Sequence, residues 1–534
     1  MTAQVCRGSL ALVNTTNEVA RRVIVTVGDH GRSAVPGGSL TPDPARTSIR
    51  AHGAVSARVF EEVRVRLSSA QVFQQIASPR PPSGSRVVMR RAVVLGGSIA
   101  GLMAARVLSD HADEVLVVER DVSDVDDGPR AGVPQGSQVH ALLPAGAVQL
   151  ERWFPGFAEE AIGGSAVVPP KDGSRDGFYL NGQPRLAPPV AQDWPVLITT
   201  RPYLEAKVRH RTLAVDNVRL VAGRADGLVF DGARVTGVRY VPEGGTEAVT
   251  ATADFVVDAM GRSSRVSDWL EAAGWPRPPL RRMPIKLNYA TAMFAYDEAI
   301  SDQWSVIAQV SPDDGRPARI GGVLRVEGDR WIMLIAGYGD DRPGRDAADY
   351  IARCRNDFPA VFGDIAERGR MLGDVVTYHQ ADSRRRDFHE LDRLPAGLAV
   401  AGDAIASFNP VYGQGMTSAA LHASCLSTYL RSDPRLDEPA RAYFDRVAVV
   451  VDAAWQVSTF ADLELPHVDG PYPRGYRLIR WFSGQVFKAS MTDAVTNDRL
   501  ARITTMLAHP QRLARPSTIL RAVRVNLLPA STRR

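Results

Sequence analysis

The alternation of apolar and polar positions from Arg91 onward predicts a strand, a turn, a helix and a second strand. Ala92–Leu95 and Val115–Val118 are short apolar runs, and Leu102–Leu108 carries apolar residues at helical spacing. The turn Gly96–Gly101 joins the first run to the helix. Short apolar runs on both sides of a helix are typical of buried parallel strands, so this stretch is predicted to be a βαβ unit.

Two later apolar runs, Phe255–Ala259 and Leu398–Ala401, are also predicted to be buried α/β strands. Between them, segments such as Arg330–Ala336 alternate and predict antiparallel strands over roughly residues 280–370. After Asp437 the spacing becomes helical, and we expect Trp455 and Trp481 to pack inside that region.

Residues 1–88 lack this periodicity and differ in charge from the rest. They hold eleven Arg, no Lys and five acidic residues, and Ser78–Gly84 reads as a linker. Met89 then opens a segment that resembles a natural protein start. We therefore expect residues 1–88 to be a poorly ordered extension or a start codon assigned too early, with a small docking module as the alternative. A protein that begins at Met89 should then fold and bind its cofactor.

Composition and charge exclude several classes of protein. The chain has 534 residues, 45% of them hydrophobic and 23% charged, which is ordinary for a globular protein. The net charge is +5, and residues 1–88 carry +6, so residues 89–534 have a net charge of −1. The main part of the chain therefore lacks the basic excess that is typical of nucleic-acid binding. No apolar run approaches the ~18 residues of a membrane span. The three distant cysteines fit neither a disulfide framework nor a metal cluster, and they favour a reducing, cytoplasmic location.

The first candidate binding site is the turn itself, Gly96-Gly97-Ser98-Ile99-Ala100-Gly101. Gly96 permits the tight turn, Gly101 permits close helix packing, and the N–H groups that open the helix can face a pyrophosphate. Glu119 ends the next strand, where a carboxylate accepts the ribose hydroxyls of an adenosine, and Arg120 beside it is included in the site. The pattern indicates a bound dinucleotide without distinguishing NAD from FAD. An ordinary strand–helix turn is the alternative.

A second candidate site lies about 300 residues later, in Gly402–Met416. A strand ends at Gly402-Asp403, where the carboxylate can accept a hydrogen bond from a ribityl hydroxyl. Pro410, Gly413, Gly415 and Met416 then lead into a helix whose first N–H groups can face a flavin ring. One long ligand contacted from both ends of the chain suits FAD and does not suit NAD, although a capped glycine turn is the alternative.

At this point the chain resembles the FAD-dependent monooxygenases of the p-hydroxybenzoate hydroxylase fold. Within them it is most similar to bacterial flavin epoxidases and hydroxylases of polyketide and terpenoid pathways, including the monensin-type epoxidases. The resemblance is carried by Val94–Gly101, Arg130–Leu143 and Gly402–Ala420. It implies that Arg130 lies near the FAD pyrophosphate, with an exposed surface arginine as the alternative, and that Arg201 opens a helix beside the cofactor.

The resemblance also implies the domain organisation. It predicts an α/β protein in which a Rossmann-like FAD-binding domain is interleaved with an antiparallel-sheet substrate domain, followed by C-terminal helices. The expected limits are 89–280 for the first part of the FAD-binding domain, with substrate-domain insertions, 281–370 for the substrate sheet, 371–430 for the second FAD part and 431–534 for the helices.

The activity that the resemblance implies is oxygen insertion. NADPH or NADH reduces FAD, reduced flavin and O2 form a C4a-hydroperoxide, and one oxygen passes to the substrate. No protein nucleophile is needed, so no catalytic residue is named. The expected reaction is epoxidation of an apolar polyketide or terpenoid alkene in secondary metabolism, as in antibiotic biosynthesis. The alternatives are an aromatic hydroxylase, a geranylgeranyl-reductase-like reductase or desaturase, and a flavoprotein without catalysis.

Two further observations refine the expected function. Met260 stands where classical hydroxylases of this fold have Asp, so we expect weak use of free NADPH or NADH, with a separate flavin reductase or substrate-stimulated reduction instead. Trp304 lies in a segment that does not match the W-x-W-x-I-P pattern of flavin halogenases. No cluster has metal-ligand spacing, and no G-x-S-x-G elbow occurs, so we expect neither a metal enzyme nor a serine hydrolase.

Overall fold

The computed structural model describes residues 20–21, 65–122, 128–130, 132–186, 196–312 and 317–527. Two compact units are distinguished, and each is described by itself. Within the smaller unit, β1 (Ala20–Arg21) pairs antiparallel with β2 (Val65–Arg66). The larger unit includes every described residue from Ser69 onward and contains the two sheets and the helices that concern the site.

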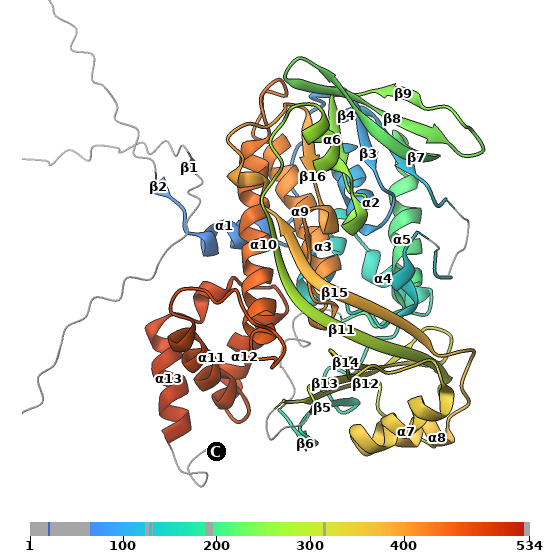
Figure 1. Ribbon diagram of the computed structural model, residues 1–534, viewed down its shortest axis with the longest axis vertical. Helices are drawn as coiled ribbons and strands as arrows, with labels where there is room; N and C mark the ends of the chain where they lie inside the picture. The colour runs from blue at the N-terminus through green and yellow to red at the C-terminus, as the bar shows by residue number, and fades with distance from the viewer. Residues whose placement is uncertain are drawn as a thin grey trace, which may run out of the picture. The chain divides into compact units, whose positions relative to one another are not determined.

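The first sheet of the larger unit has seven described strands, and its central part is parallel. The order is β16-β10-β3-β4-β7-β8-β9, with parallel pairing from β16 to the first half of β7 and antiparallel pairing beyond (Figure 1). Its strands are β3 (Met89–Leu95), β4 (Ala112–Glu119), β7 (Val218–Asp231), β8 (Arg234–Pro242), β9 (Val249–Thr252), β10 (Phe255–Asp258) and β16 (Leu398–Val400). The four apolar runs predicted as buried strands are thus neighbours in one sheet, as β16, β10, β3 and β4.

The second sheet is antiparallel apart from the pairing of its strands β5 and β12. The order of its eight described strands is β17-β15-β11-β14-β13-β12-β5-β6, and the long strands β11 and β15 run side by side (Figure 1). The strands are β5 (Asp176–Leu180), β6 (Gln183–Pro184), β11 (Leu280–Ala295), β12 (Ser305–Val310), β13 (Arg319–Val326), β14 (Arg330–Tyr338), β15 (Val376–Arg386) and β17 (Ala406–Ser407). This sheet therefore extends beyond the expected limits of 281 and 370, because β15 is needed to cover one edge of β11.

Helices cover both sheets and continue to the C-terminal region. They are α1 (Ser69–Ile76), α2 (Ile99–Leu108), α3 (Pro144–Trp153), α4 (Phe157–Gly163), α5 (Arg201–Leu213), α6 (Val266–Ala272), α7 (Ala347–Asp357), α8 (Ala360–Arg368), α9 (Gln414–Leu430), α10 (Arg441–Asp462), α11 (Tyr476–Ser490), α12 (Ala494–Thr504) and α13 (Pro516–Leu527). The described helices include none with the length and apolar character required to cross a bilayer. The predicted class, an α/β protein with an antiparallel sheet and C-terminal helices, is confirmed.

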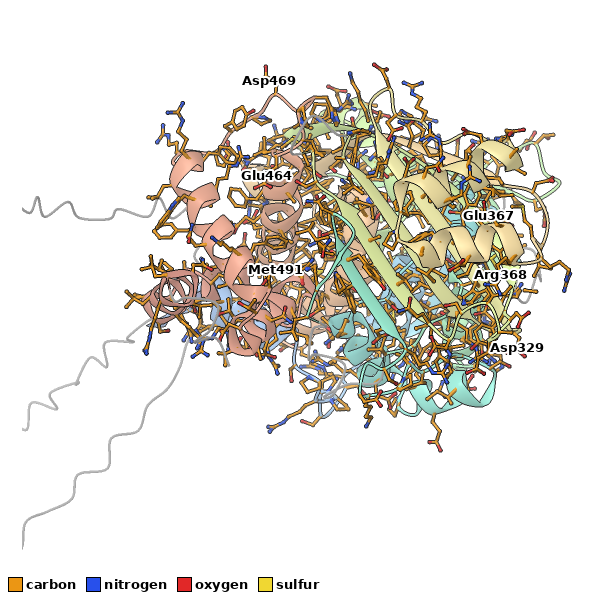
Figure 2. All side chains as sticks on the ribbon, turned by 90° about the horizontal axis from the view of Figure 1, so that it is seen from below. Asp329, Glu367, Arg368, Glu464, Asp469 and Met491 are labelled. Carbon is orange, nitrogen blue, oxygen red and sulfur yellow. The ribbon has the colours of Figure 1, made fainter. Side chains whose placement is uncertain are left out.

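The second sheet has a buried core on each face, since side chains alternate along a strand. On one face, Phe294 and Trp331 pack with Phe362 of α8 and with α7. On the other, Tyr289 and Tyr338 pack with Leu463 and residues that follow α10. Figure 2 shows Glu367 and Arg368 of α8 on the side of the larger unit opposite Glu464 and Asp469.

Helix α1 corrects the expected boundary at Met89. Val72, Phe73 and Ile76 on α1 are buried, and the helix contacts α9 and α10. The ring of Phe73 meets the ring of His509 edge-on, with centroids 5.7 Å apart. Residues 69–88 therefore belong to the larger unit, because these apolar side chains lose contact with water there. Most of residues 1–68 lie outside the described residues, so the expectation that they are poorly ordered stays a prediction.

Candidate functional site

Close backbone approach explains the glycines of the first motif. Gly96 has a φ of +101°, and a Cβ built on it would lie 2.5 Å from the carbonyl oxygen of Ala259. A Cβ on Gly101 would lie 1.8 Å from the carbonyl oxygen of Gly96. Neither position can hold a side chain without moving backbone, so the turn brings the start of α2 directly over the ends of β3 and β10.

The second motif reaches the same place from the other end of the chain. A Cβ on Gly402 would lie 2.5 Å from the Cβ of Ala100, so the two motifs are in contact. The N–H of Gly402 donates a hydrogen bond to Nδ1 of His422 on α9, over 3.0 Å. Burial lowers the pKa of His422 to about 3, so the ring stays neutral and can accept this bond. His422 therefore holds the turn, a role that nothing in the sequence indicated.

A cavity of about 800 Å³ lies between the two motifs and the second sheet. Fourteen of the sixteen predicted cofactor residues line it: Gly96, Ser98, Ile99, Ala100, Glu119, Arg120, Arg130, Arg201, Gly402, Asp403, Pro410, Gly413, Gly415 and Met416. The other two, Gly97 and Gly101, form the turn beneath. Residues more than 300 positions apart are thus brought to one cavity, and its volume lies within the ~300–1,000 Å³ of small-molecule sites.

Three helices begin at this cavity. Ile99 and Ala100 open α2, Arg201 opens α5, and Gly415 and Met416 lie in the first turn of α9, and all of them line the cavity. The first N–H groups of a helix have no partner within the helix, and they carry a partial positive charge. The three helix N-termini therefore favour an anionic ligand such as a pyrophosphate.

Glu119 is held in place by backbone donors. Its two carboxylate oxygens accept hydrogen bonds from the N–H of Gly97, at 2.5 Å, and from the N–H of Asp121, at 2.9 Å. Arg130 approaches the same carboxylate at 3.9 Å. Glu119 thus ends β4 facing the turn, as the fingerprint predicts.

A buried carboxylate that the sequence did not single out lies between the two predicted arginines. Glu205 accepts hydrogen bonds from Nε of Arg130, at 2.9 Å, and from Nη2 of Arg201, at 3.2 Å. The hydroxyl of Ser98 donates to it at 2.6 Å. The i,i+4 spacing of Arg201 and Glu205 on a helix was the available signal. Arg130 and Arg201 are thus neither exposed nor distant from each other.

The electrostatics of this cluster suit a ligand with phosphate groups. Burial opposes the ionisation of Glu205, but Arg201, Arg130 and Ser98 outweigh it and hold the pKa of Glu205 below its ordinary value. Arg130 and Arg201 thus face the ionised Glu205, and Arg130 also approaches Glu119 at 3.9 Å. Nε of Arg201 is buried and has no hydrogen-bond partner among the described residues. A pyrophosphate would supply the missing acceptor, so this donor set fits the FAD that the sequence predicts.

Asp403 lies after β16 and lines the same cavity. Burial raises the pKa of Asp403, and Arg201 and Arg262 only partly offset that effect. Arg262 itself pairs with Asp382 and donates a hydrogen bond to the hydroxyl of Ser407 at 3.2 Å. Asp403 is therefore a buried polar group directed at the cavity by the turn that follows the strand.

Met260 also lines the cavity, and its backbone is fixed by Asp258 at the end of β10. Oδ1 of Asp258 accepts the N–H of Met260 at 3.0 Å, and Oδ2 accepts the hydroxyl of Ser264 at 2.5 Å. Burial raises the pKa of Asp258 to about 6, against the effect of these hydrogen bonds. Asp258 thus holds the backbone in place, and the side chain of residue 260 contributes to the wall.

The wall contributed by the second sheet is aromatic and polar. Tyr289, Tyr378 and Gln380 line the cavity, and the rings of the two tyrosines have centroids 5.5 Å apart. Phe294 of β11 and Trp331 of the neighbouring strand β14 lie in the core on the opposite face. Sequence reasoning missed Tyr289 because alternation alone does not say which face of a strand meets the ligand.

A smaller cavity of about 420 Å³ adjoins the first one along α5. The two share Arg130, Val133 and Arg201, and the smaller one continues to Arg209 and Leu213. Glu205 lines the smaller cavity.

Among the described residues, one group of side chains has ligand atoms close enough for a metal ion. Asp387, His389 and Glu390 place such atoms within 4.8 Å of one another. Both carboxylates form ion pairs with Arg281, and Asp387 also pairs with Arg385. Arginines already balance the charge of the group, so it carries no argument for a metal centre.

The chain is similar to known proteins over most of its length. Residues 90–433 match the family model described as FAD binding domain. Protein Rv3254 of Mycobacterium tuberculosis (strain ATCC 25618 / H37Rv) is 30% identical over 82% of this chain and 94% of its own length. A kynurenine 3-monooxygenase of Salinispora arenicola (strain CNS-205) is 27% identical over 73% of this chain and 81% of its own length. The structure of the flavin-dependent brominase Bmp2 superposes with a TM-score of 0.58, covering 82% of this chain and 98% of that chain at 14% identity, which shows a shared fold.

Proposed function

The chain belongs to the FAD binding domain family of flavin-dependent monooxygenases and hydroxylases, and from that premise we propose that it inserts one oxygen atom of O2 into an apolar small molecule. The observation that supports this most directly is the cavity itself. Both flavin-type motifs and three helix N-termini border it on one side, and an aromatic wall of the second sheet borders it on the other.

The sixteen predicted residues are proposed to hold FAD. The turn at Gly96–Gly101, with Arg130 and Arg201, would bind the pyrophosphate, Glu119 the adenosine ribose and Asp403 a ribityl hydroxyl. We expect Asp403→Ala to lose a hydrogen bond of ~1.5–3 kcal/mol, which is about ten- to a hundredfold in FAD affinity. Titration of FAD into the apo-variant measures this, with Asp172→Ala on an exposed loop as the control. Wild-type affinity in Asp403→Ala would contradict the placement.

FAD, when bound, supplies the redox and oxygen chemistry of this fold. The chain itself would orient the substrate and exclude water, since water at the reacting centre releases the oxygen as hydrogen peroxide. Tyr289, Tyr378 and Gln380 are the residues placed to do this. Burial raises the pKa of both tyrosines, so they stay neutral and present O–H groups to the substrate.

Two kinds of acceptor are proposed. Epoxidation of an alkene in an apolar polyketide or terpenoid follows from the resemblance carried by Arg130–Leu143 and Gly402–Ala420. Hydroxylation of an aromatic ring is the second candidate, because one relative is named as a kynurenine monooxygenase and the cavity has an aromatic wall.

Product analysis tests the proposal. The FAD-loaded protein is supplied with NADPH or NADH, with and without a flavin reductase, under ¹⁸O2 and with polyene or phenolic candidates. Mass spectrometry should find one ¹⁸O atom in the product, and the product should be an epoxide or a phenol. Reduction or desaturation of a substrate without oxygen consumption would instead support a reductase, and it would overturn the oxygenase assignment.

A further inference from the structure

The C-terminal helices α11 to α13 gather positive charge out of proportion to their length. Residues 471–527 contain nine Arg, one Lys, two Asp and no Glu, a net charge of +8, whereas the whole chain sums to +5. Neither α11 nor α13 contains an acidic residue. Together with residues 1–88, which carry +6, these helices are thus one of two strongly basic parts of the chain.

The same region exposes an unusual share of large apolar side chains. Of the thirteen found exposed in the described part of the chain, seven lie here: Tyr472, Leu478, Trp481, Phe487, Val495, Leu520 and Leu527. Trp481 is 51% exposed, so the sequence expectation that it packs inside the helical region is wrong. The inner face of α11 is already covered, since Val486 and Ala489 pack against Ala522 of α13.

Charge and apolar groups share the outer face of α11. Arg477, Trp481 and Lys488 recur at helical spacing, and Leu478 lies beside them, all exposed. Among the described residues, neither Arg477 nor Lys488 forms an ion pair, whereas Arg480 at the edge of the face approaches Glu464 at 3.7 Å. An outer face that combines Trp, Leu and unpaired basic groups is typical of helices that lie in the plane of a membrane interface.

We propose that this face, called here the α11 surface (Arg477, Leu478, Trp481 and Lys488), docks the protein on an anionic phospholipid bilayer. Basic groups are attracted to acidic headgroups, and Trp prefers the boundary between headgroups and acyl chains. Neither of the two cavities described above is lined by residues of α11. A second copy of the chain is disfavoured, because two equally basic faces repel each other.

Figure 2 places Met491, which directly follows α11, on the side of the larger unit away from Glu367 and Arg368 of α8. The strands of the second sheet lie between them. This inference goes beyond the proposed oxygenase activity and does not depend on it.

The test uses the full chain with FAD bound and two kinds of vesicle. Vesicles of phosphatidylcholine alone are compared with vesicles of phosphatidylcholine and phosphatidylglycerol in a ratio of about 7:3, which gives a negative surface potential. The protein should sediment with the second kind, less at high salt than at low salt, and not with the first.

Variants locate the contact. Arg477→Gln with Lys488→Gln should weaken the partition by about fivefold for each charge removed. Trp481→Ala should weaken it on the order of tenfold, as expected for roughly 60 Å² of apolar contact. The matched controls, Arg219→Gln on β7 and Val249→Ala on β9, change an exposed charge and an exposed apolar group elsewhere and should bind as the wild type does. Unchanged flavin absorbance confirms that the variants are folded.

Several results would overturn the proposal. Equal sedimentation with both vesicles, or with neither, would remove the charge-dependent docking. Anionic vesicle binding that the α11 variants leave unchanged would assign the contact to another part of the chain. A concentration-dependent dimer that Trp481→Ala abolishes in sedimentation velocity would assign the surface to a second copy.

Discussion

Arg130 and Arg201 come from different parts of the chain and converge on one carboxylate. Glu205 lies between them, and its ionised form stabilises both guanidinium groups in a site where burial makes an unpaired charge costly. The same arginines are proposed to bind the FAD pyrophosphate. Glu205 is therefore the internal counter-ion that keeps them in position before the cofactor arrives.

Replacing this counter-ion should couple stability to the cofactor. We expect Glu205→Gln to destabilise the apo-protein by ~3–5 kcal/mol, the usual cost of breaking a buried pair. FAD should then raise the melting temperature of Glu205→Gln more than that of the wild type, because its pyrophosphate becomes the main counter-ion. Thermal unfolding with and without FAD measures both effects. Glu160→Gln, which removes a partly exposed pair with Arg211, is the control. Equal FAD-induced shifts in all three proteins would show that Glu205 has no such role.

Met260 gives a second prediction at the scale of one residue. A thioether cannot accept the hydrogen bonds that a carboxylate accepts, so the wall at this position offers the nicotinamide donor no anionic partner. We expect slow reduction of the bound flavin by NADPH alone and faster reduction in Met260→Asp. Stopped-flow absorbance measures this, with Met260→Leu as the volume-matched control. Rapid, saturable reduction of the wild type by micromolar NADPH, in the absence of substrate, would refute the prediction.

The loop Asn409–Gly413, which is proposed to face the flavin and is called here the flavin loop, is held by the end of α10. Asp462, the last residue of α10, accepts hydrogen bonds from Nδ2 of Asn409 at 2.7 Å and from the hydroxyl of Tyr412 at 2.9 Å. Asn409 directly precedes Pro410, and Tyr412 directly precedes Gly413, which leads into α9. Oδ2 of Asp462 is buried without a partner among the described residues. One carboxyl group of a C-terminal helix thus anchors the loop proposed to face the flavin.

This link should make stability depend on pH. Burial raises the pKa of Asp462 to about 7, although Asn409 and Tyr412 oppose the shift. The unfolded chain releases this proton near pH 4 and the folded protein only near pH 7, so this group lowers the free energy of unfolding as pH rises between these values. Above pH 7 its effect is constant.

We expect Asp462→Asn to remove that dependence. The amide keeps an acceptor for Asn409 and Tyr412 but cannot ionise. The difference in unfolding free energy, variant minus wild type, should rise from pH 5 to pH 8 by an amount on the order of 1 kcal/mol or more per pKa unit of the shift covered. Urea unfolding at both pH values, at one FAD concentration, gives this difference. Parallel pH profiles would mean that Asp462 does not titrate as the structure indicates.

Across the whole molecule, helix α1 ties a segment before the FAD-binding domain to its C-terminal part. Arg152 of α3 donates a hydrogen bond from Nη1 to the carbonyl of Ile76 at 3.0 Å, and Phe73 meets His509. Val72, Phe73 and Ile76 are each at most 5% exposed. Their burial joins α1 to α9 and α10, which carry the flavin loop and its anchor.

Truncation at two places tests this role. The sequence alone led us to expect that a protein beginning at Met89 folds; the structure leads us to expect the opposite result. Removing α1 exposes the side chains that it contacts and lowers the free energy of unfolding by ~1.5–3 kcal/mol for each fully buried side chain that is lost. A protein that begins at Ser69 keeps these contacts. The first should be markedly less stable or insoluble and the second should melt close to the full chain, as thermal unfolding of FAD-loaded samples will show. Equal melting temperatures would restore the boundary at Met89.

The sequence by itself determined the features that depend on local pattern. Apolar runs at the periods of strands and helices located β3, α2, β4, β10 and β16. Gly96 and Gly101 could be placed in a close turn because only glycine tolerates that backbone approach, and fourteen of the sixteen predicted cofactor residues line one cavity. The turn and its helix could be predicted because neighbouring residues specify them, whereas the cofactor that these residues would hold stays a prediction.

Only the tertiary structure decided which distant groups meet. Glu205, His422 and Asp462 are ordinary helix residues in the sequence, and their roles follow from partners between 20 and 107 positions away. The choice of Tyr289 over Phe294 for the cavity depends on which face of β11 packs against α7 and α8. The burial of α1 and the exposure of Trp481 likewise depend on which helix faces find a partner. Local pattern shows that a side chain is apolar or ionisable, but packing decides whether it meets a core, a counter-ion or water.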